Sequence, residues 1–207
     1  MILHLLGSRG VPTFLFALMA LIAGAAALRS GGPADVAFHL LGMCLWLMFA
    51  VLVNVRPAPR RRGREVMGVI AALSAQLAFV LIGLFAGSSG HGPVLIAGDV
   101  LLGGGLVFAI ASVAVLGRCF GVLPDVRGLV TRGPYRLVRH PLYLGELTAG
   151  MGIVLGASRW APALAAWVLC VGLQLTRTAY EERALRAEFP EYDAYAERTR
   201  RLIPGVV

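Results

Sequence analysis

The sequence predicts an all-α membrane protein: a polytopic bundle of about six transmembrane helices, the last two a helical hairpin, followed by a cytoplasmic C-terminal helical lid. Three observations support this class. Hydrophobic residues make up 58% of the 207 residues and charged residues only 14%, whereas soluble proteins have roughly 45–50% and about 25%. Six apolar runs approach the length of a membrane span, and arginine residues gather in alternate loops.

The six apolar runs are separated by short polar segments. A transmembrane helix needs about 20 mostly apolar residues, and its backbone must satisfy its own hydrogen bonds, so each run is expected to be helical. The runs cover residues 11–28, 36–55, 66–86, 94–116, 142–157 and 160–176. Only Ser158 and Arg159 separate the last two, which predicts a tight hairpin.

The arginine residues indicate how these helices are oriented. Five of them lie in the loop after the second run: Arg56, Arg60, Arg61, Arg62 and Arg64. The loop before the hairpin and the C-terminal tail are equally basic, whereas the alternate loops contain only Arg29 and Arg159. Because basic residues collect in cytoplasmic loops, both termini are predicted to be cytoplasmic.

The net charge of +8 is therefore explained by the membrane edges, and no nucleic-acid partner is expected. No obligate protein partner is evident either, so the expected partners are membrane lipids and a lipophilic small molecule or lipid. The high Ala, Gly, Leu and Arg content suggests a prokaryotic source, and hence its cytoplasmic membrane. The three cysteines follow no metal-binding spacing, so no metal site is expected.

The chain divides near residue 116 into two regions of different character. Residues 1–116 contain almost no acidic or catalytic side chains and are predicted to be a four-helix scaffold. Residues 117–207 combine a polar loop, the hairpin and a charged tail. The last apolar run is expected to continue as one helix to Glu188, to break at Pro190, and to be followed by a short amphipathic helix over residues 192–201 that folds back along the membrane surface.

Small residues mark one face of the first hairpin helix. They are Gly145, Ala149, Gly152 and Gly156, at spacings of four, three and four. Because small side chains let two helix backbones approach closely in lipid, this face is predicted to pack against another helix.

The loop before the hairpin contains the most distinctive local pattern. Residues 132–145 read Arg-Gly-Pro-Tyr-Arg-Leu-Val-Arg-His-Pro-Leu-Tyr-Leu-Gly. Pro141 suits the first position of a helix and His140 the N-cap, so free amide groups would face the loop and suit an anion such as a carboxylate. Tyr135 and Tyr143 offer flat faces for a purine. An ordinary interfacial belt of Arg, His and Tyr explains the same spacing, and spacing alone does not decide between the two readings.

A second charged pattern lies where the last helix leaves the membrane. Arg177 and Glu181 are four residues apart and therefore share a helix face. Charge at this depth is expensive and usually functional. The alternative is a surface ion pair that contributes little.

Several of these elements together resemble a known family, that of the isoprenylcysteine carboxyl methyltransferases and phospholipid methyltransferases. The resemblance covers residues 117–204. It rests on Leu129-Val-Thr-Arg-Gly-Pro-Tyr135, Arg139-His-Pro-Leu-Tyr-Leu-Gly145, Glu181-Glu182-x-x-Leu185, Phe189, Tyr192-x-x-Tyr195 and Ile203-Pro204. The segment Phe189-Pro190-Glu191-Tyr192 is one residue shorter than the family pattern.

The resemblance implies a membrane-embedded enzyme that transfers a methyl group from S-adenosylmethionine, leaving S-adenosylhomocysteine, with the cofactor bound on the cytoplasmic side. The implied cofactor-binding residues are Arg127, Gly128, Leu129, Val130, Tyr135, His140, Pro141, Leu142, Tyr143 and Glu181. Arg177 is implied to hold the polar end of the substrate. Arg177 would orient a carboxylate, whereas Glu181 would take the proton of an amine or thiol.

Two other functions remain open at this stage. The Arg-His-Pro-x-Tyr element also resembles that of NADPH-dependent sterol reductases, although those typically have Asn where this chain has Leu142. The other alternative is a non-enzymatic membrane component. A transporter would be expected to place ionisable groups near mid-membrane, and the first four runs contain essentially none.

Overall fold

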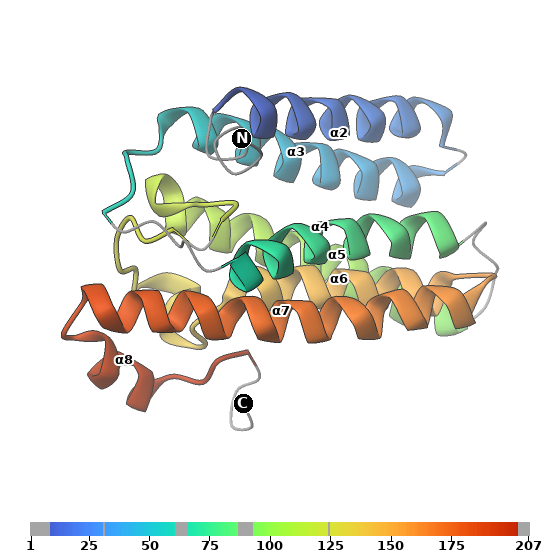
Figure 1. Cartoon of the computed structure of the whole chain (residues 1–207). Helices are drawn as coiled ribbons and strands as arrows, with labels where there is room; N and C mark the ends of the chain where they lie inside the picture. Colours follow the sequence, from blue (N-terminus) through green and yellow to red (C-terminus); the bar gives the residue numbers. More distant parts are fainter. Residues whose placement is uncertain (1–8, 31, 61–65, 87–92, 124, 203–207) are drawn as a thin grey trace.

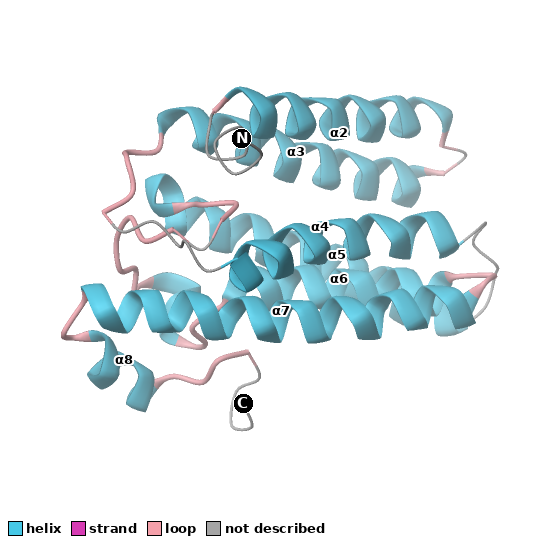
Figure 2. Cartoon of the chain, in the orientation of Figure 1, coloured by secondary structure: helices cyan, strands magenta, loops and turns pink. Residues whose placement is uncertain are grey.

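The computed structural model describes residues 9–30, 32–60, 66–86, 93–123 and 125–202, and all regular structure in these segments is helical (Figure 2). The long helices are α2 (Gly10–Arg29), α3 (Pro33–Val55), α4 (Val66–Ala86), α5 (Pro93–Leu116), α6 (Pro141–Gly156) and α7 (Trp160–Glu188). Two 3-10 turns, η1 (Gly117–Cys119) and η2 (Gly133–Arg136), lie between α5 and α6, and α8 (Tyr192–Arg198) follows α7. The predicted all-helical class is confirmed.

The six long helices run side by side along one direction (Figure 1). Three pairs make the most extensive contacts, α2 with α3, α5 with α6, and α4 with α7. The α3–α5, α6–α7 and α4–α6 contacts join these pairs into one bundle. The bundle therefore brings the end of α5, the start of α6 and the second half of α7 into one neighbourhood.

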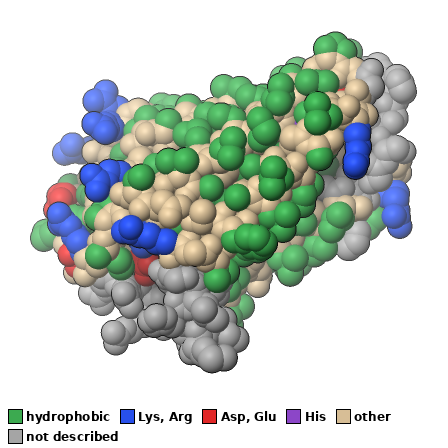
Figure 3. All heavy atoms as spheres, turned by 90° about the horizontal axis from the view of Figure 1, so that it is seen from above, with side chains coloured by type: hydrophobic (Ala, Val, Ile, Leu, Met, Phe, Trp, Pro, Cys, Tyr) green, Lys and Arg blue, Asp and Glu red, His purple; other side chains and the backbone are tan. Residues whose placement is uncertain are grey.

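The helices begin within three residues of the predicted apolar runs, and α7 continues without a break to Glu188 as predicted. Within the described residues, three helical segments are long and apolar enough to cross a membrane: Gly10–Arg29, Pro33–Val55 and Ile96–Cys119, with mean hydropathies of 2.2 to 2.4. In the view from above, hydrophobic side chains cover the middle of the molecule and basic side chains lie toward its two ends (Figure 3). This distribution is that of an integral membrane protein.

Helices α5 and α6 approach so closely that a Cβ atom does not fit at Gly105 or Gly152. A Cβ atom on Gly105 would lie 2.4 Å from the Ala149 nitrogen and 2.7 Å from the Gly145 oxygen. A Cβ atom on Gly152 would lie 2.5 Å from the Gly98 oxygen. The small-residue face of α6 is therefore a helix contact, as predicted.

The C-terminal tail differs from its prediction. The short helix ends at Arg198 and not at residue 201, because Thr199 adopts an extended conformation. The following backbone then pairs with the loop before α6: the Arg139 N–H donates to the Arg200 oxygen (2.7 Å) and the His140 N–H to the Arg201 oxygen (3.1 Å). The predicted basic residues Arg61, Arg62 and Arg64 and the Ile203-Pro204 element lie outside the described residues.

Candidate functional site

The loop between α5 and α6 folds back over the end of the bundle. It leaves α5 through Gly117 and turns again at Gly133, and both glycines have a positive φ (54° and 59°) that other residues rarely adopt. A Cβ atom on Gly133 would also lie 3.1 Å from a methyl group of Val115. Glycine at position 133 thus lets η2 return to α5, and this return encloses a pocket.

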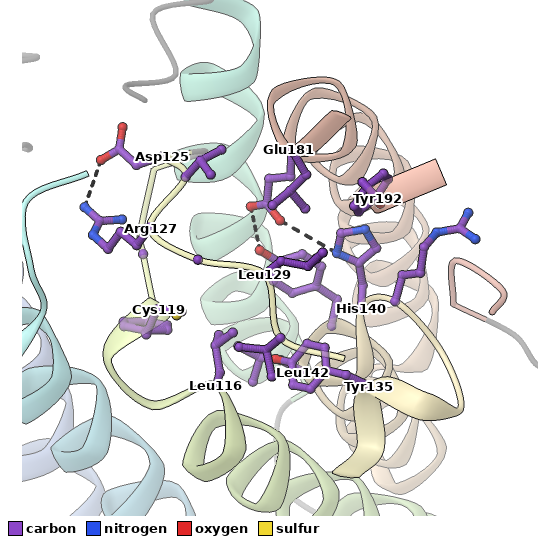
Figure 4. A pocket seen from close by; sticks show the side chains of 18 of the residues that line it. Leu116, Cys119, Asp125, Arg127, Leu129, Tyr135, His140, Leu142, Glu181 and Tyr192 are labelled. Atoms are coloured by element: carbon purple, nitrogen blue, oxygen red, sulfur yellow. Dashed lines mark hydrogen bonds and ion pairs between the residues drawn. The ribbon is translucent and has the colours of Figure 1, made fainter. Parts of the chain in front are cut away.

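The pocket is lined by the end of α5, the loop, the start of α6, the second half of α7, and α8 (Figure 4). Nine of the ten predicted cofactor-binding residues line it: Arg127, Gly128, Leu129, Val130, Tyr135, His140, Leu142, Tyr143 and Glu181. The tenth, Pro141, is not among the lining residues; it is the first residue of α6, between two that are. The loop and Glu181 of α7 therefore line one cavity.

His140 stands at the start of α6 and faces Glu181 and Glu182 of α7. Its Nδ1 atom is 3.7 Å from a Glu181 oxygen and its Nε2 atom 3.4 Å from a Glu182 oxygen. Its ring stacks on that of Tyr143, with centroids 5.5 Å apart. His140 occupies the N-cap position, but its side chain makes no capping hydrogen bond. The imidazole is turned toward the pocket, where Figure 4 shows it opposite Glu181.

Glu181 and Tyr143 form the floor of the pocket, and Arg177 lies beneath them. The Tyr143 hydroxyl donates to a Glu181 oxygen at 2.7 Å, and the Arg177 Nε–H donates to the same oxygen at 2.9 Å. The guanidinium lies over the Tyr143 ring, 4.7 Å from its centroid. Arg177 Nη2 also donates to the backbone oxygens of Gly121 (3.3 Å) and Val122 (3.0 Å).

Arg177 is only 2% exposed, so the surface-ion-pair alternative is wrong. Burial alone would lower the pKa of Arg177, but the nearby Tyr143, Glu181 and Glu146 raise it above its usual value. Arg177 is therefore a permanent cation. It does not line the pocket itself and lies beneath Tyr143.

Glu182, one residue further along α7, fastens the tail over the pocket. It is fully buried and accepts hydrogen bonds from Arg139 (2.8 Å) and from Arg201 (3.1 and 3.2 Å). Burial would raise the pKa of Glu182, but the nearby His140 ring and hydrogen bonds from Arg201 and Arg139 lower it well below its usual range. Glu182 thus stays ionised and links the loop, α7 and the tail.

Through this link, α8 becomes a wall of the pocket. Tyr192 is 1% exposed, and both Tyr192 and Tyr195 line the cavity. The Tyr195 hydroxyl donates to the Tyr135 oxygen at 2.7 Å, and burial raises the pKa of Tyr195 to about 12. Burial raises the pKa of Tyr135 still further, so both phenols remain neutral donors at physiological pH.

On the opposite side, Arg127 joins the loop to the α3–α4 connection. It forms an ion pair with Asp125 (3.0 Å) and donates to the Pro57 oxygen (3.3 Å). Its Nη1 atom is buried and has no hydrogen-bond partner among the described residues. A Cβ atom on Gly121 would come within 2.5 Å of this nitrogen, so glycine at position 121 leaves the room that the guanidinium occupies.

Two further polar residues, Glu146 on α6 and Gln174 on α7, were missed by the sequence analysis. The Gln174 amide donates to a Glu146 oxygen at 2.9 Å, and both side chains are buried. A signal was available, because Glu146 is a carboxylate inside an apolar run, and such residues are usually functional. In the described residues, no group of three or more His, Cys, Asp or Glu side chains is arranged to hold a metal ion.

Comparison with known proteins identifies the region that contains this site. Residues 93–191 match the phospholipid methyltransferase family. The chain is 35% identical over 130 residues to the nickel-cobalt-cadmium resistance protein NccN of Alcaligenes xylosoxydans xylosoxydans, covering 60% of this chain and 59% of that protein. It is 43% identical over 79 residues to the cobalt-zinc-cadmium resistance protein CzcN of Cupriavidus metallidurans (37% and 35% of the two chains).

A third relative carries an enzyme name. The chain is 33% identical over 129 residues to protein-S-isoprenylcysteine O-methyltransferase A of Arabidopsis thaliana, covering 59% of this chain and 66% of that protein. Each match thus spans less than two thirds of the relative's own length. The family match begins at α5 and ends just before α8, and so contains most of the pocket. Residues 93–191, just under half of the chain, therefore match the phospholipid methyltransferase family.

Proposed function

We propose that this protein is a membrane-embedded methyltransferase that moves a methyl group from S-adenosylmethionine to a lipophilic acceptor. One observation carries the proposal: the loop 127–143 and the Arg177–Glu181 turn of α7, far apart in sequence, line or underlie a single pocket. The family of residues 93–191 supports the same chemistry.

The side chains around the pocket suit the parts of this cofactor. The unpartnered Nη1 of Arg127 suits the carboxylate of its amino acid end. Tyr135, Tyr192 and the apolar Leu142 suit a purine, which stacks on flat or apolar surfaces. Glu181, an acceptor of two hydrogen bonds, suits the amino group or the ribose hydroxyls.

The cofactor supplies a methyl group already activated on a positively charged sulfur, so the protein has to align the reactants and exclude water. Tyr192 and Tyr195 close one side of the pocket and the loop closes another. The Glu182 link keeps both in place. No metal is required for this chemistry.

For the topology, we propose that all six long helices are embedded in the membrane, with the pocket and both termini on the cytoplasmic side of a prokaryotic inner membrane and α8 acting as a lid. The described arginines at the pocket end, which include Arg56, Arg60 and Arg118, support this orientation. Arg29 and Arg159 are the basic residues near the opposite ends of the helices.

The acceptor is proposed to enter sideways from the bilayer, between the α6–α7 hairpin and its neighbours. The names of the relatives point in two directions, metal resistance for two and isoprenylcysteine methylation for the third. A lipophilic carboxylate, thiol or amine, or a phospholipid, remains in keeping with the proposal, and neither nucleic acid nor an obligate protein partner is proposed.

Calorimetric titration of the purified protein with adenosylhomocysteine and, separately, with NADPH tests the proposal. Adenosylhomocysteine should bind and NADPH should not. Glu181→Gln and Tyr135→Ala should each weaken adenosylhomocysteine by at least about tenfold, whereas Glu197→Gln, an exposed change on α8, should not. Tight binding of NADPH alone would favour a reductase, and binding of neither ligand would favour a non-enzymatic component.

A further inference from the structure

A buried polar cluster extends from the pocket floor into the bundle, between α6 and α7. It consists of Glu146, Gln174 and Arg177, which are 8%, 2% and 2% exposed. Glu146 lies about one helical turn beyond Tyr143 of the pocket, and Gln174 about one turn before Arg177. The cluster therefore lies directly behind the floor, on the membrane side of the cofactor pocket.

Two atoms of this cluster have no hydrogen-bond partner in the part of the chain that the structure describes. One is a donor, Nη1 of Arg177, and the other an acceptor, Oε1 of Gln174. Leaving a buried polar atom unpaired is costly, so native structures pair such atoms with a ligand or water. A ligand that donates one hydrogen bond and accepts another would satisfy both.

The charges of the cluster restrict that ligand further. The positive charge of Arg177 is already paired with Glu181 at 2.9 Å. Glu146 has the neutral amide of Gln174 as its hydrogen-bond partner. Arg177, Glu181 and Glu146 together therefore carry one excess negative charge when both carboxyls are ionised. A carboxylate ligand would add a second negative charge, and Arg177, the cation of this cluster, is already paired, so its binding would be costly in a dry site.

From this arrangement, and resting on the proposed function, we propose that Glu146, Gln174 and Arg177 form the acceptor end of the methyltransferase site and select a hydroxyl or thiol group on a lipophilic molecule. Such a group donates its hydrogen to Gln174 Oε1 when it binds and turns it to Glu146 when it reacts. One lone pair accepts from Arg177 Nη1 and another remains for the reaction. An amine has a single lone pair, so an amine that attacks the methyl group leaves Arg177 Nη1 unpaired.

Glu146 acts as the base in this reaction. The acceptor oxygen or sulfur forms the new bond to the methyl carbon, and the electron pair of the broken carbon–sulfur bond stays on the departing sulfur. The acceptor proton passes to the Glu146 carboxylate, which later releases it to water. Glu181 is less suited to this step than the sequence suggested, because the Tyr143 hydroxyl and Arg177 Nε both donate to its Oε1 atom.

Other titratable groups act on the same region and have to be considered in any pH measurement. They are Tyr143 on α6, Arg177, Glu181 and Cys170 on α7, and Tyr135 in η2. Arg177 and Glu181 are paired with each other. A pH dependence that disappears in a Glu146 variant is therefore assigned to Glu146 and not to this set.

The test compares three probes of equal chain length: decanethiol, 4-decylphenol and decanoic acid. The protein is saturated with adenosylhomocysteine, and its thermal stability is measured with each probe. Methyl transfer from labelled S-adenosylmethionine is measured separately. The thiol or the phenol should stabilise the protein and be methylated at least tenfold faster than decanoic acid.

Glu146→Gln should slow thiol methylation at pH 7 by at least tenfold, and the loss should shrink at higher pH, where the thiol ionises without a base. Glu146→Asp should recover part of the rate, and Glu197→Gln should leave it unchanged. Adenosylhomocysteine affinity should be unaltered in all three variants. If Glu146→Gln does not fold, the probe ranking on the wild type and the Glu146→Asp profile decide the outcome.

Faster methylation of decanoic acid than of the other two probes overturns the inference, as does an unchanged rate and pH profile in the Glu146 variants. If no probe is methylated, the stabilisation measurement decides. Stabilisation by decanoic acid alone overturns the inference. Stabilisation by none of the probes also overturns it, because water then fills the cluster. Failure of the wild type to bind adenosylhomocysteine would instead refute the proposed function.

Discussion

Replacing Glu182 by glutamine should release the tail from the pocket while leaving the bundle intact. The variant removes the negative charge that pairs with Arg139 at 2.8 Å and Arg201 at 3.1 Å. The Arg139 side chain is 12% exposed and would be left largely buried without a counter-charge, whereas Arg201 is 30% exposed and can be solvated. The Arg139 contact therefore accounts for most of the loss.

Truncating one partner of a fully buried ion pair costs about 3–5 kcal/mol, and exposed pairs contribute about 0–1 kcal/mol. Glutamine keeps the shape of the side chain and can still accept one hydrogen bond, so we expect a loss of about 2 kcal/mol in tail docking. This corresponds to a roughly thirtyfold increase in the undocked population, since every 1.4 kcal/mol is tenfold.

Hydrogen exchange at the Arg139 and His140 amides measures this population directly, because both amides are bonded to the tail. Their protection should fall by roughly thirtyfold in Glu182→Gln and stay unchanged in the exposed control Glu197→Gln. Protection within the α5–α6 contact should not change in either variant. Unaltered protection at Arg139 and His140 would refute the role assigned to Glu182, and a loss over the whole bundle would indicate global destabilisation instead.

The remaining predictions concern pH, helix packing and cofactor contact. The pKa of Glu182 is lower in the folded than in the unfolded protein, so its stabilisation is present above about pH 4 and is lost as the pH falls further. Amide protection of the tail, corrected for intrinsic exchange, should therefore be constant from pH 5 to 8. Gly105→Ala should lower the thermal unfolding temperature, at a cost of about 1–3 kcal/mol, because its Cβ would lie 2.4 Å from the Ala149 nitrogen. In the neighbouring Gly104→Ala the Cβ meets nothing within 4 Å, so this control should be tolerated. Equal effects of the two substitutions would contradict the close contact. In calorimetry, Arg127→Ala should weaken the binding of adenosylhomocysteine at least about tenfold and leave the binding of methylthioadenosine, which lacks the carboxylate, unchanged. An equal loss of affinity for both ligands would mean that Arg127 only supports the loop.

The helices could be predicted from the sequence because each is an uninterrupted apolar run, and run length alone sets the bounds in a bilayer. The α5–α6 contact followed in part from the spacing of Gly145, Ala149 and Gly152, although that spacing did not name α5 as the partner. Such features depend on neighbouring residues in the chain, and for this reason they are accessible from a single sequence.

The site was predictable only where the family resemblance reached. Spacing alone left Tyr135 and Tyr143 equally explained by an interfacial belt, and only the fold brings them beside Glu181. The position of Tyr192 depends on the turn after Pro190 and on the Glu182 link, neither of which a local pattern determines. Glu146 could have been recognised from its place in an apolar run.

The backbone pairing of residues 139–140 with residues 200–201 has a consequence for biosynthesis. Residues 139–140, just before α6, are synthesised about sixty residues before residues 200–201, so their amides lack these hydrogen-bond partners while the α6–α7 hairpin forms. The cavity can close only once residues 199–202 have left the ribosome. A polypeptide arrested before that point would lack this backbone pairing, and the pocket would then be without the wall that the tail supplies.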